Sequence, residues 1–179
     1  MKLTPDRQVM VRMDLFIAPV GEALLILVVA LAGWLSREPF IFASLGPTAY
    51  ELIETPHRRS ARPYSIFVGH LTGIGAAFLA LFLTAARHSP PVSTAGVPLI
   101  RVWATVLAAA LTVFVTLLLH ASQPAAIATS ILISSGLLQR PIDAAVILGA
   151  VILMILVGEP LRRLRLRYQK SHTQAEKPS

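Results

Sequence analysis

The strongest constraint on the fold is a series of apolar stretches long enough to cross a lipid bilayer. The first, from Leu15 to Leu35, contains a single charged residue, Glu22. About 20 apolar residues in a helix span the hydrocarbon core of a membrane. Further apolar stretches cover residues 64–86, 102–119 and 144–157. Only 14% of all residues are charged, against about 25% in typical soluble domains. The sequence therefore predicts an all-α, polytopic membrane helix bundle with four long spans.

Two shorter apolar segments, each with a proline near its start, lie between the long spans. They cover residues 40–53 and 121–138, and their starts, Ser44–Ala49 and Ala121–Ala126, are similar to each other. A proline fits the first turn of a helix, because its missing N–H would be unpaired there. We therefore expect each segment to begin a helix inside the apolar layer. In lipid such a break is stable only where it is buried in protein or lines a cavity, and a helix start favours anions.

The segments follow the order long, short, long, loop, long, short, long, which is a two-fold internal repeat. We expect Gly158-Glu159-Pro160 to end the last membrane helix, since proline breaks helices. The tail after it is basic and is predicted to be disordered from about Ser171. The predicted divisions are a cytoplasmic N-terminal segment over 1–14, a membrane domain over 15–158 with repeats over 15–86 and 97–158, and a cytoplasmic tail over 159–179.

Two topologies are open, because the short segments either cross the membrane or re-enter it. If all six segments cross, 12 of the 16 Lys and Arg residues lie on the side of the N-terminus; with re-entrant segments the division is 11 to 5. Lys and Arg concentrate on the cytoplasmic side, and the cluster of Arg58, Arg59 and Arg62 favours six crossings with both termini in the cytoplasm. The second repeat is then inverted, as in many secondary transporters, whose substrate sites use helix N-termini near the midplane.

The candidate solute site consists of the polar and small residues around the two breaks, together with a nearby histidine. The hydroxyl and amide side chains either bind a small solute or cap the helices and bond across them. His70 titrates near neutral pH and is a candidate proton relay or anion ligand; the alternative is a packing histidine bonded to a backbone carbonyl. The predicted substrate-binding residues are Ser44, Gly46, Pro47, Thr48, His70, Ser122, Gln123, Pro124 and Thr129.

Other ionisable residues carry weaker signals. Glu22 either lies at membrane depth, where ionisable residues are functional candidates, or lies near the cytoplasmic interface and reaches the lipid head groups. Glu51 and Glu54 end the first short segment and are interpreted as ion-pair partners of the nearby arginine cluster. The remaining candidates, at the ends of segments, are His120, Arg62 and Arg140.

The sequence lacks the patterns of several other functional classes. It contains no cysteine, which excludes disulfides, thiolate metal sites and cysteine nucleophiles. It has no metalloprotease, nucleotide-binding or hydrolase motif, so we predict no enzyme activity, no cofactor and no metal site. The basic clusters are interpreted as cytoplasmic loops and not as nucleic-acid-binding surfaces, because they adjoin membrane-length apolar stretches.

Both halves of the chain contain short motifs in a recognisable order. The first half contains Phe42–Ala49, Pro56, Ala61–Pro63 and Gly69-His70; the second half contains Ser122–Thr129 and Ser134–Leu138. Over about residues 16–157 the chain resembles the HPP family of integral membrane proteins. That family is named after a His-Pro-Pro sequence, and here Ser122-Gln123-Pro124 stands at its position. The resemblance implies a four-span membrane protein, and because some plant and cyanobacterial members are implicated in nitrite transport, a candidate small-anion transporter.

We predict a transporter or channel in the cytoplasmic membrane for a small solute, with a monovalent anion such as nitrite as the expected substrate. The anion would bind where the two helix starts face each other near the midplane, with His70 beside them. The alternative is a non-transporting scaffold or sensor partner whose Gly69–Gly75 face binds another protein. A transporter requires a water-accessible cavity at the breaks, whereas a scaffold packs them dry. The expected partners are the lipid bilayer, a small anion and, given the small size, a second copy of the chain, but no nucleic acid.

Overall fold

The computed structural model describes residues 5–175, with side chains described over residues 15–169 except Ala95. Regular secondary structure in this range is entirely helical. The helices are α1 (Pro5–Ser36), α2 (Leu45–Ile53), α3 (Pro63–Leu83), α4 (Val92–Ala95), α5 (Leu99–Leu118), α6 (Pro124–Ser134) and α7 (Pro141–Ala175), with 3₁₀ turns η1 (Arg59–Ala61) and η2 (Ala86–His88). The predicted order of long and short helices is confirmed, and the single-turn helix α4 lies in the predicted loop between the two repeats.

Four of these helices are long and apolar enough to cross a membrane. They are Leu15–Ser36 of α1, all of α3 and α5, and Pro141–Gln169 of α7, with mean hydropathy values of 2.0 to 2.5. Large apolar side chains such as Phe16, Trp103 and Phe114 lie on their outer faces, each more than 60% exposed. A helix that is apolar on its exposed face as well as its buried face is typical of a membrane span. The chain is therefore a polytopic helical membrane bundle, as predicted.

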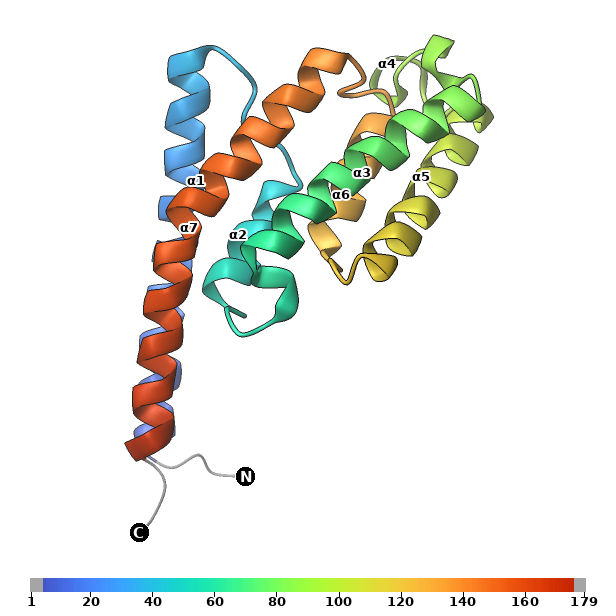
Figure 1. Cartoon of the computed structure of the whole chain (residues 1–179). Coiled ribbons are helices and arrows are strands. Elements are labelled where there is room, and N and C mark those ends of the chain that lie inside the picture. Colours follow the sequence, from blue (N-terminus) through green and yellow to red (C-terminus); the bar gives the residue numbers. More distant parts are fainter. Residues whose placement is uncertain (1–4, 176–179) are drawn as a thin grey trace.

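The two halves of the chain exchange their third helices. Helices α1 and α2 pack against α7, whereas α3 packs against α5 and α6 (Figure 1). Contacts between α3 and α7, and between α2 and α6, join the two groups. Each repeat therefore contributes its last long helix to the other group, so neither repeat is a packing unit by itself.

Corresponding long helices of the two halves run in opposite directions. In Figure 1, α1 and α3 run away from the end of the molecule at which α1 begins, whereas α5 and α7 run toward that end. The start of α1 and the end of α7 consequently lie at the same end of the bundle. This is the inverted arrangement that the order of segments predicts.

Helices α3 and α6 approach closely because glycines remove side chains from their contact. A Cβ atom on Gly69 would lie 2.7 Å from the Cβ of Gln123, and one on Gly73 would collide with the backbone oxygen of Ala126. A Cβ on Gly75, in contrast, would meet open space. Small residues spaced in this way let membrane helices pack backbone to backbone. The face of Gly69 and Gly73 is thus filled by α6 and is not free for another protein.

The prediction that Gly158-Glu159-Pro160 ends the last helix is wrong, because α7 continues to Ala175 with Pro160 inside it. A Cβ atom on Gly158 would lie 2.6 Å from the Cδ1 of Leu52. This glycine therefore permits the close approach of α7 to α2 and does not terminate the helix. An interior proline removes one backbone hydrogen bond, and tertiary contacts stabilise the helix on both sides of it.

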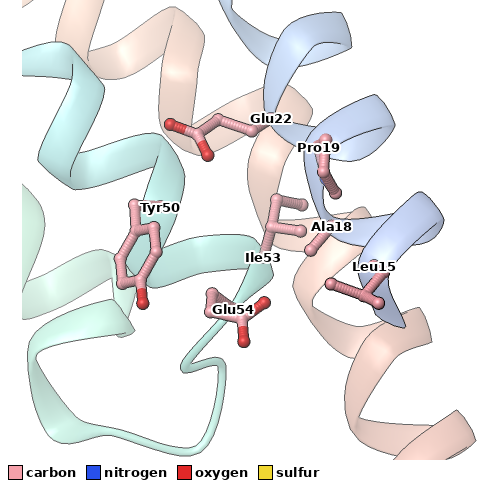
Figure 2. A pocket seen from close by; sticks show the side chains of 7 residues that line it. All are labelled: Leu15, Ala18, Pro19, Glu22, Tyr50, Ile53 and Glu54. Carbon is pink, nitrogen blue, oxygen red and sulfur yellow. The ribbon is translucent and has the colours of Figure 1, made fainter. Parts of the chain in front are cut away.

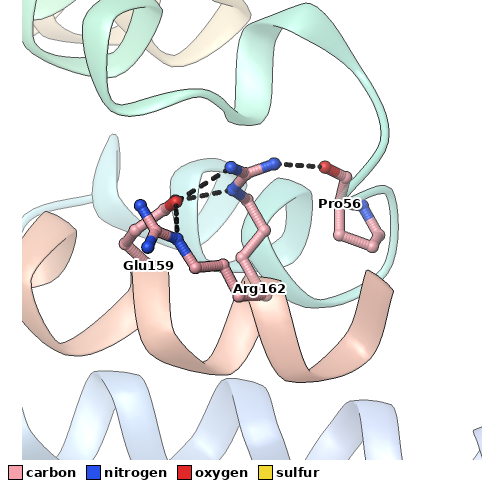
Figure 3. Close-up of polar contacts among 4 residues, drawn as sticks. Pro56, Glu159 and Arg162 are labelled. Atoms are coloured by element: carbon pink, nitrogen blue, oxygen red, sulfur yellow. Dashed lines mark hydrogen bonds and ion pairs between the residues drawn. The ribbon is translucent and has the colours of Figure 1, made fainter. Parts of the chain in front are cut away.

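Side-chain contacts hold the part of α7 beyond the proline against the end of α2. Arg162 donates two hydrogen bonds to Glu159, at 2.6 and 2.9 Å, and Arg163 donates one at 2.7 Å. Arg162 also donates to the backbone oxygen of Pro56, in the loop after α2, at 2.9 Å (Figure 3). Local sequence rules miss this extension because its stabilising partners lie more than 100 residues away in the chain.

The two ends of the chain also differ from the predicted divisions. Helix α1 begins at Pro5 and α7 ends at Ala175, so residues 5–14 and 171–175 are helical. The apolar spans of both helices are thereby extended at the same end of the bundle, and α1 contacts α7 (Figure 1). Residues 1–4 and 176–179, which complete the predicted cytoplasmic segment and tail, lie outside the described residues.

Substitution of Gly73 by valine should destabilise the protein by about 1–3 kcal/mol, because the added side chain would force α6 away from α3. Gly75→Val is the matched control, since it makes the same change on the same helix where a Cβ meets open space. Thermal unfolding of both purified variants in detergent measures the difference. Equal melting temperatures for the two variants would contradict the close helix contact.

Candidate functional site

A buried polar cluster joins the two short helices through α3. The imidazole of His70 lies with Nε2 3.1 Å from the Oγ1 of Thr48 on α2, and with Nδ1 2.7 Å from the Oγ1 of Thr129 on α6. All three side chains are 0% exposed. His70 lies seven residues after the start of α3, which is about 10 Å along the helix. The cluster is therefore inside the apolar layer, where α2, α3 and α6 meet.

The hydrogen bonds of this cluster depend on the number of protons on His70. Thr48 Oγ1 lies 3.2 Å from the backbone oxygen of Ser44, and Thr129 Oγ1 lies 3.3 Å from that of Ala125. With the two contacts to the ring, this makes four contacts, each of which needs one proton. The two hydroxyl groups supply two protons, a neutral imidazole supplies one and an imidazolium supplies two. Only a doubly protonated ring satisfies all four contacts at once.

The start of α2 contains a buried polar group without a partner. Ser44 precedes α2 at the N-cap position, its side chain is 1% exposed, and its Oγ makes no hydrogen bond, not even the usual cap to the helix. Buried polar atoms are normally paired, and serine at this position normally accepts a bond from a helix N–H. The positive end of α2 therefore carries an unused hydroxyl group.

The start of α6 is already occupied by its own cap. Gln123 is 3% exposed, its Oε1 accepts from the backbone N–H of Ala125 at 3.4 Å, and its Nε2 donates to the backbone oxygen of Ser60 at 3.4 Å. Pro124, which follows, is exposed. The two proline-led helix starts are thus different: a buried side chain fills the start of α6, and the hydroxyl at the start of α2 is unpaired.

The structure brings together only part of the predicted site. Thr48, His70 and Thr129 are in contact, and Ser44 and Gln123 lie within one or two turns of them on the same helices. Four predicted residues do not join the cluster: Gly46 is half-buried, and Pro47, Ser122 and Pro124 are exposed. The groups that meet at His70 are the first turn of α2 and the second turn of α6.

Glu22 lines a separate pocket of about 470 Å³ between α1 and the end of α2 (Figure 2). Tyr50 and Glu54 of the other wall lie across from it, and the remaining lining residues are Leu15, Ala18, Pro19 and Ile53. The hydrogen-bond partners of His70, Thr48 and Thr129, do not line this pocket. Among the described residues, no group of three or more His, Asp or Glu side chains has the arrangement of metal ligands.

Arg101, in the first turn of α5, is not among the residues predicted from the sequence and is only 1% exposed. Its guanidinium donates to the Oε1 of Gln139 and to three backbone oxygens, those of Ser89, Pro90 and Ser134. Ser134 is the last residue of α6, where the helix dipole is negative. Arg101 therefore stabilises the end of α6. The only signal in the sequence is an arginine three residues after Pro98, at the start of an apolar stretch.

The end of α2 has a similar arginine contact. Arg165 of α7 is 6% exposed and donates from Nε to the backbone oxygen of Ile53, the last residue of α2, at 3.2 Å. The remaining sequence candidates lie elsewhere: His120 and Arg62 are exposed, and Arg140 pairs with Asp143 at 3.0 Å. The hydrogen bond to Asp143 raises the pKa of Arg140.

Thr129→Val should lower stability by about 1–3 kcal/mol, because it leaves a buried nitrogen of His70 without its partner. Thr116→Val is the matched control: Thr116 is also buried, but its hydroxyl bonds only backbone oxygens of its own helix. Denaturation of the two purified variants in detergent compares them. If Thr116→Val proves as destabilising as Thr129→Val, the contact with His70 contributes nothing specific.

Comparison with known proteins supports the assignment of the chain to a family. The family model described as "HPP, transmembrane region" matches residues 7–168. Comparison with curated proteins and with solved structures gives no match. The matched range includes both short helices, the His70 cluster and α7 beyond Pro160.

Proposed function

Because the chain belongs to the HPP family of integral membrane proteins, we propose that it carries a small solute across the cytoplasmic membrane, and that this solute is a monovalent anion such as nitrite. The observation that carries the proposal is the contact of His70 with one threonine from each short helix. An ionisable side chain at membrane depth is costly and usually functional. Short helices that begin inside the membrane form the substrate sites of many secondary transporters.

In this proposal the anion binds at the start of α2, beside the unpaired Oγ of Ser44. The positive end of the dipole of α2 supplies partial positive charge there. The negative charge of the anion also balances an imidazolium at His70, the protonation state that satisfies all four hydrogen bonds of the cluster. Anion binding and protonation of His70 therefore favour each other.

The buried arginines support an anion rather than a cation at this position. Arg101 and Arg165 donate to the last residues of α6 and α2, which are the negative ends of the two short helices. The negative ends are thus compensated by positive side chains, while the first turn of α2 carries no acidic residue and no described ion pair lies at that end. An anion at that end completes the charge balance.

The cluster is closed in this structure, since Ser44, Thr48, His70 and Thr129 are each at most 1% exposed. Transport therefore requires α2 or α6 to move relative to α3, so that the site opens to each side in turn. The same burial favours the second candidate function, a non-transporting scaffold in which the breaks serve packing alone. The Gly69 and Gly73 face cannot bind a partner in that case, because α6 fills it.

Uptake by the full-length protein in proteoliposomes separates the two functions. We expect uptake of nitrite that rises when the outside is made acidic, because the anion and the proton on His70 stabilise each other. His70→Gln should reduce uptake by about ten-fold or more, the effect of losing a charge-assisted contact. His88→Gln, at an exposed histidine, is the control and should leave uptake unchanged. Absence of uptake for nitrite, nitrate and formate at every pH gradient would refute anion transport and favour the scaffold.

Ser44→Ala tests where the anion binds. Because the Oγ of Ser44 has no hydrogen-bond partner among the described residues, its removal should not lower the melting temperature. It should raise the KM for uptake by roughly ten-fold through loss of one hydrogen bond to the anion. Ser93→Ala, at an exposed serine, is the control. An unchanged KM in the Ser44 variant would exclude this position from the site.

A further inference from the structure

Glu51 is a second buried ionisable group, at the opposite end of α2 from Ser44. Its side chain is 6% exposed. Ser60 Oγ donates a hydrogen bond to Oε1 at 2.8 Å, while Oε2 has no partner. Among the described residues Glu51 makes no ion pair, so the interpretation of this residue as a partner of the arginine cluster is wrong. The function proposed above makes no use of this carboxyl group.

The charged side chains on the elements around α2 are engaged elsewhere. Helix α2 contacts α1, α6, α7 and η1, and α6 carries no titratable residue. On α7, Arg162 binds Glu159 and the backbone oxygen of Pro56, and Arg165 binds the backbone oxygen of Ile53. The other titratable groups described on these elements are Glu22 of α1, which lines the pocket, Tyr50 and Glu54 at α2 itself, and Arg163 of α7, which binds Glu159. On α7, Arg167 and Tyr168 also have interaction partners. In and beside η1, the side chains of His57, Arg58, Arg59 and Arg62 are exposed.

The position of Glu51 favours a bound cation. It lies in the last turn of α2, where the helix dipole is negative and a further negative charge is unfavourable. A buried carboxylate that is unpaired also loses the solvation that water provides. Thr55, four residues later, has a second buried oxygen without a partner, its Oγ1. Carboxylate, hydroxyl and carbonyl oxygens are the ligands of hard cations, and the C-terminal ends of short membrane helices bind Na⁺ or H⁺ in transporters.

A chain of contacts connects Glu51 to the His70 cluster. Ser60 binds Glu51 through its hydroxyl and accepts a hydrogen bond from the side chain of Gln123 through its backbone oxygen. Gln123 caps α6 and packs against Gly69, the residue before His70. A change of charge at Glu51 therefore acts on the residue that holds the start of α6, the helix that supplies Thr129.

We propose that the carboxyl group of Glu51 binds a small monovalent cation, a proton or a sodium ion, and that this cation is the coupling ion of transport. Cation binding stands on the geometry at Glu51, whereas the coupling role rests on the transport function proposed above. A cation bound to Glu51 neutralises its charge and weakens the hydrogen bond that Ser60 donates to it. Ser60 is the residue that connects Glu51 to Gln123 and so to the His70 cluster.

Thermal unfolding of the purified full-length protein in detergent tests the site without reference to transport. The melting temperature, followed by tryptophan fluorescence, is compared in sodium chloride and in choline chloride, and at mildly alkaline and mildly acidic pH. A cation bound only by the folded protein should raise the melting temperature by about 3 °C when the cation concentration is about ten times its dissociation constant. A rise with sodium identifies Na⁺; a rise on acidification alone identifies H⁺.

Two neutral variants test whether Glu51 is responsible for the rise in melting temperature. Glu51→Gln should abolish it, and Glu54→Gln, three residues further on at a half-buried position, should retain it. If the wild-type protein responds to neither condition, or if Glu51→Gln responds as the wild type does, the site is refuted.

Carbodiimide labelling of the wild-type protein gives an answer even if Glu51→Gln fails to fold. The protonated carboxyl group adds across a C=N bond of dicyclohexylcarbodiimide, and the resulting O-acylisourea rearranges to a stable N-acylurea with no leaving group. Mass spectrometry should find this adduct on Glu51 at mildly acidic pH, and sodium should suppress it if Na⁺ is the ligand. Labelling of Glu22 and Glu54 with none on Glu51 would refute a cation-binding carboxyl group at this position.

The proteoliposome assay tests the coupling role. If the stability experiment identifies Na⁺, nitrite uptake by the wild type and by Glu54→Gln should depend on the sodium gradient, and uptake by Glu51→Gln should not. If it identifies H⁺, uptake by Glu51→Gln should depend less on the proton gradient than uptake by the wild type and by Glu54→Gln, because only the proton on His70 then contributes. If the stability response is present but the wild type takes up no anion, the cation site stands and the transport function fails. If Glu51→Gln shows uptake with unchanged coupling, the coupling role is refuted.

Discussion

The requirement that every backbone polar group be paired inside a membrane governs this structure. Two short helices, α2 and α6, interrupt the apolar layer, and each is preceded and followed by irregular chain. In lipid such segments persist only when protein groups satisfy their ends. Gln123 caps the start of α6, Arg101 binds its end, and Arg165 binds the end of α2. At the start of α2 no side chain among the described residues forms a cap, and the proposed function follows from that difference.

The exchange of third helices places the polar cluster at the junction of the two halves. His70 belongs to the first repeat, but its helix packs against α5 and α6 of the second. The residues it contacts come from both halves, Thr48 from the first and Thr129 from the second. A movement of one group of helices against the other must therefore change the hydrogen bonds of His70. This arrangement links the chemistry of the site to the relative position of the two halves, which is what alternating access requires.

Much of the architecture can be predicted from local sequence, and the wrong predictions have identifiable physical causes. The lengths of the apolar stretches predicted the four spans, and the prolines at 47 and 124 marked the starts of the short helices, because helix starts tolerate proline. The glycines at 69 and 73, assigned in the alternative function to a face for another protein, instead pack against α6. The end of α7 was predicted wrongly, because Pro160 breaks a helix only when no tertiary contact stabilises the part that follows. Here Arg162 and Arg165 bind backbone oxygens of distant residues, Pro56 and Ile53. The burial of Arg101 and Glu51 was likewise not predicted, since a charged residue near the end of an apolar segment is expected to lie at the membrane interface.

The sequence by itself determined that this chain is a membrane helix bundle, in which order its helices follow, and where two of them begin, because these properties depend on hydrophobic length and on the local geometry of proline. Only the tertiary structure decided which polar residues form a site. Thr48 and His70 are 22 residues apart in the chain, and His70 and Thr129 are 59 apart, so no local pattern relates them. Tertiary packing also decided that the two similar helix starts differ. One is filled by the side chain of Gln123, while the serine at the other is buried without a partner, because burial and pairing depend on neighbours that distant segments supply.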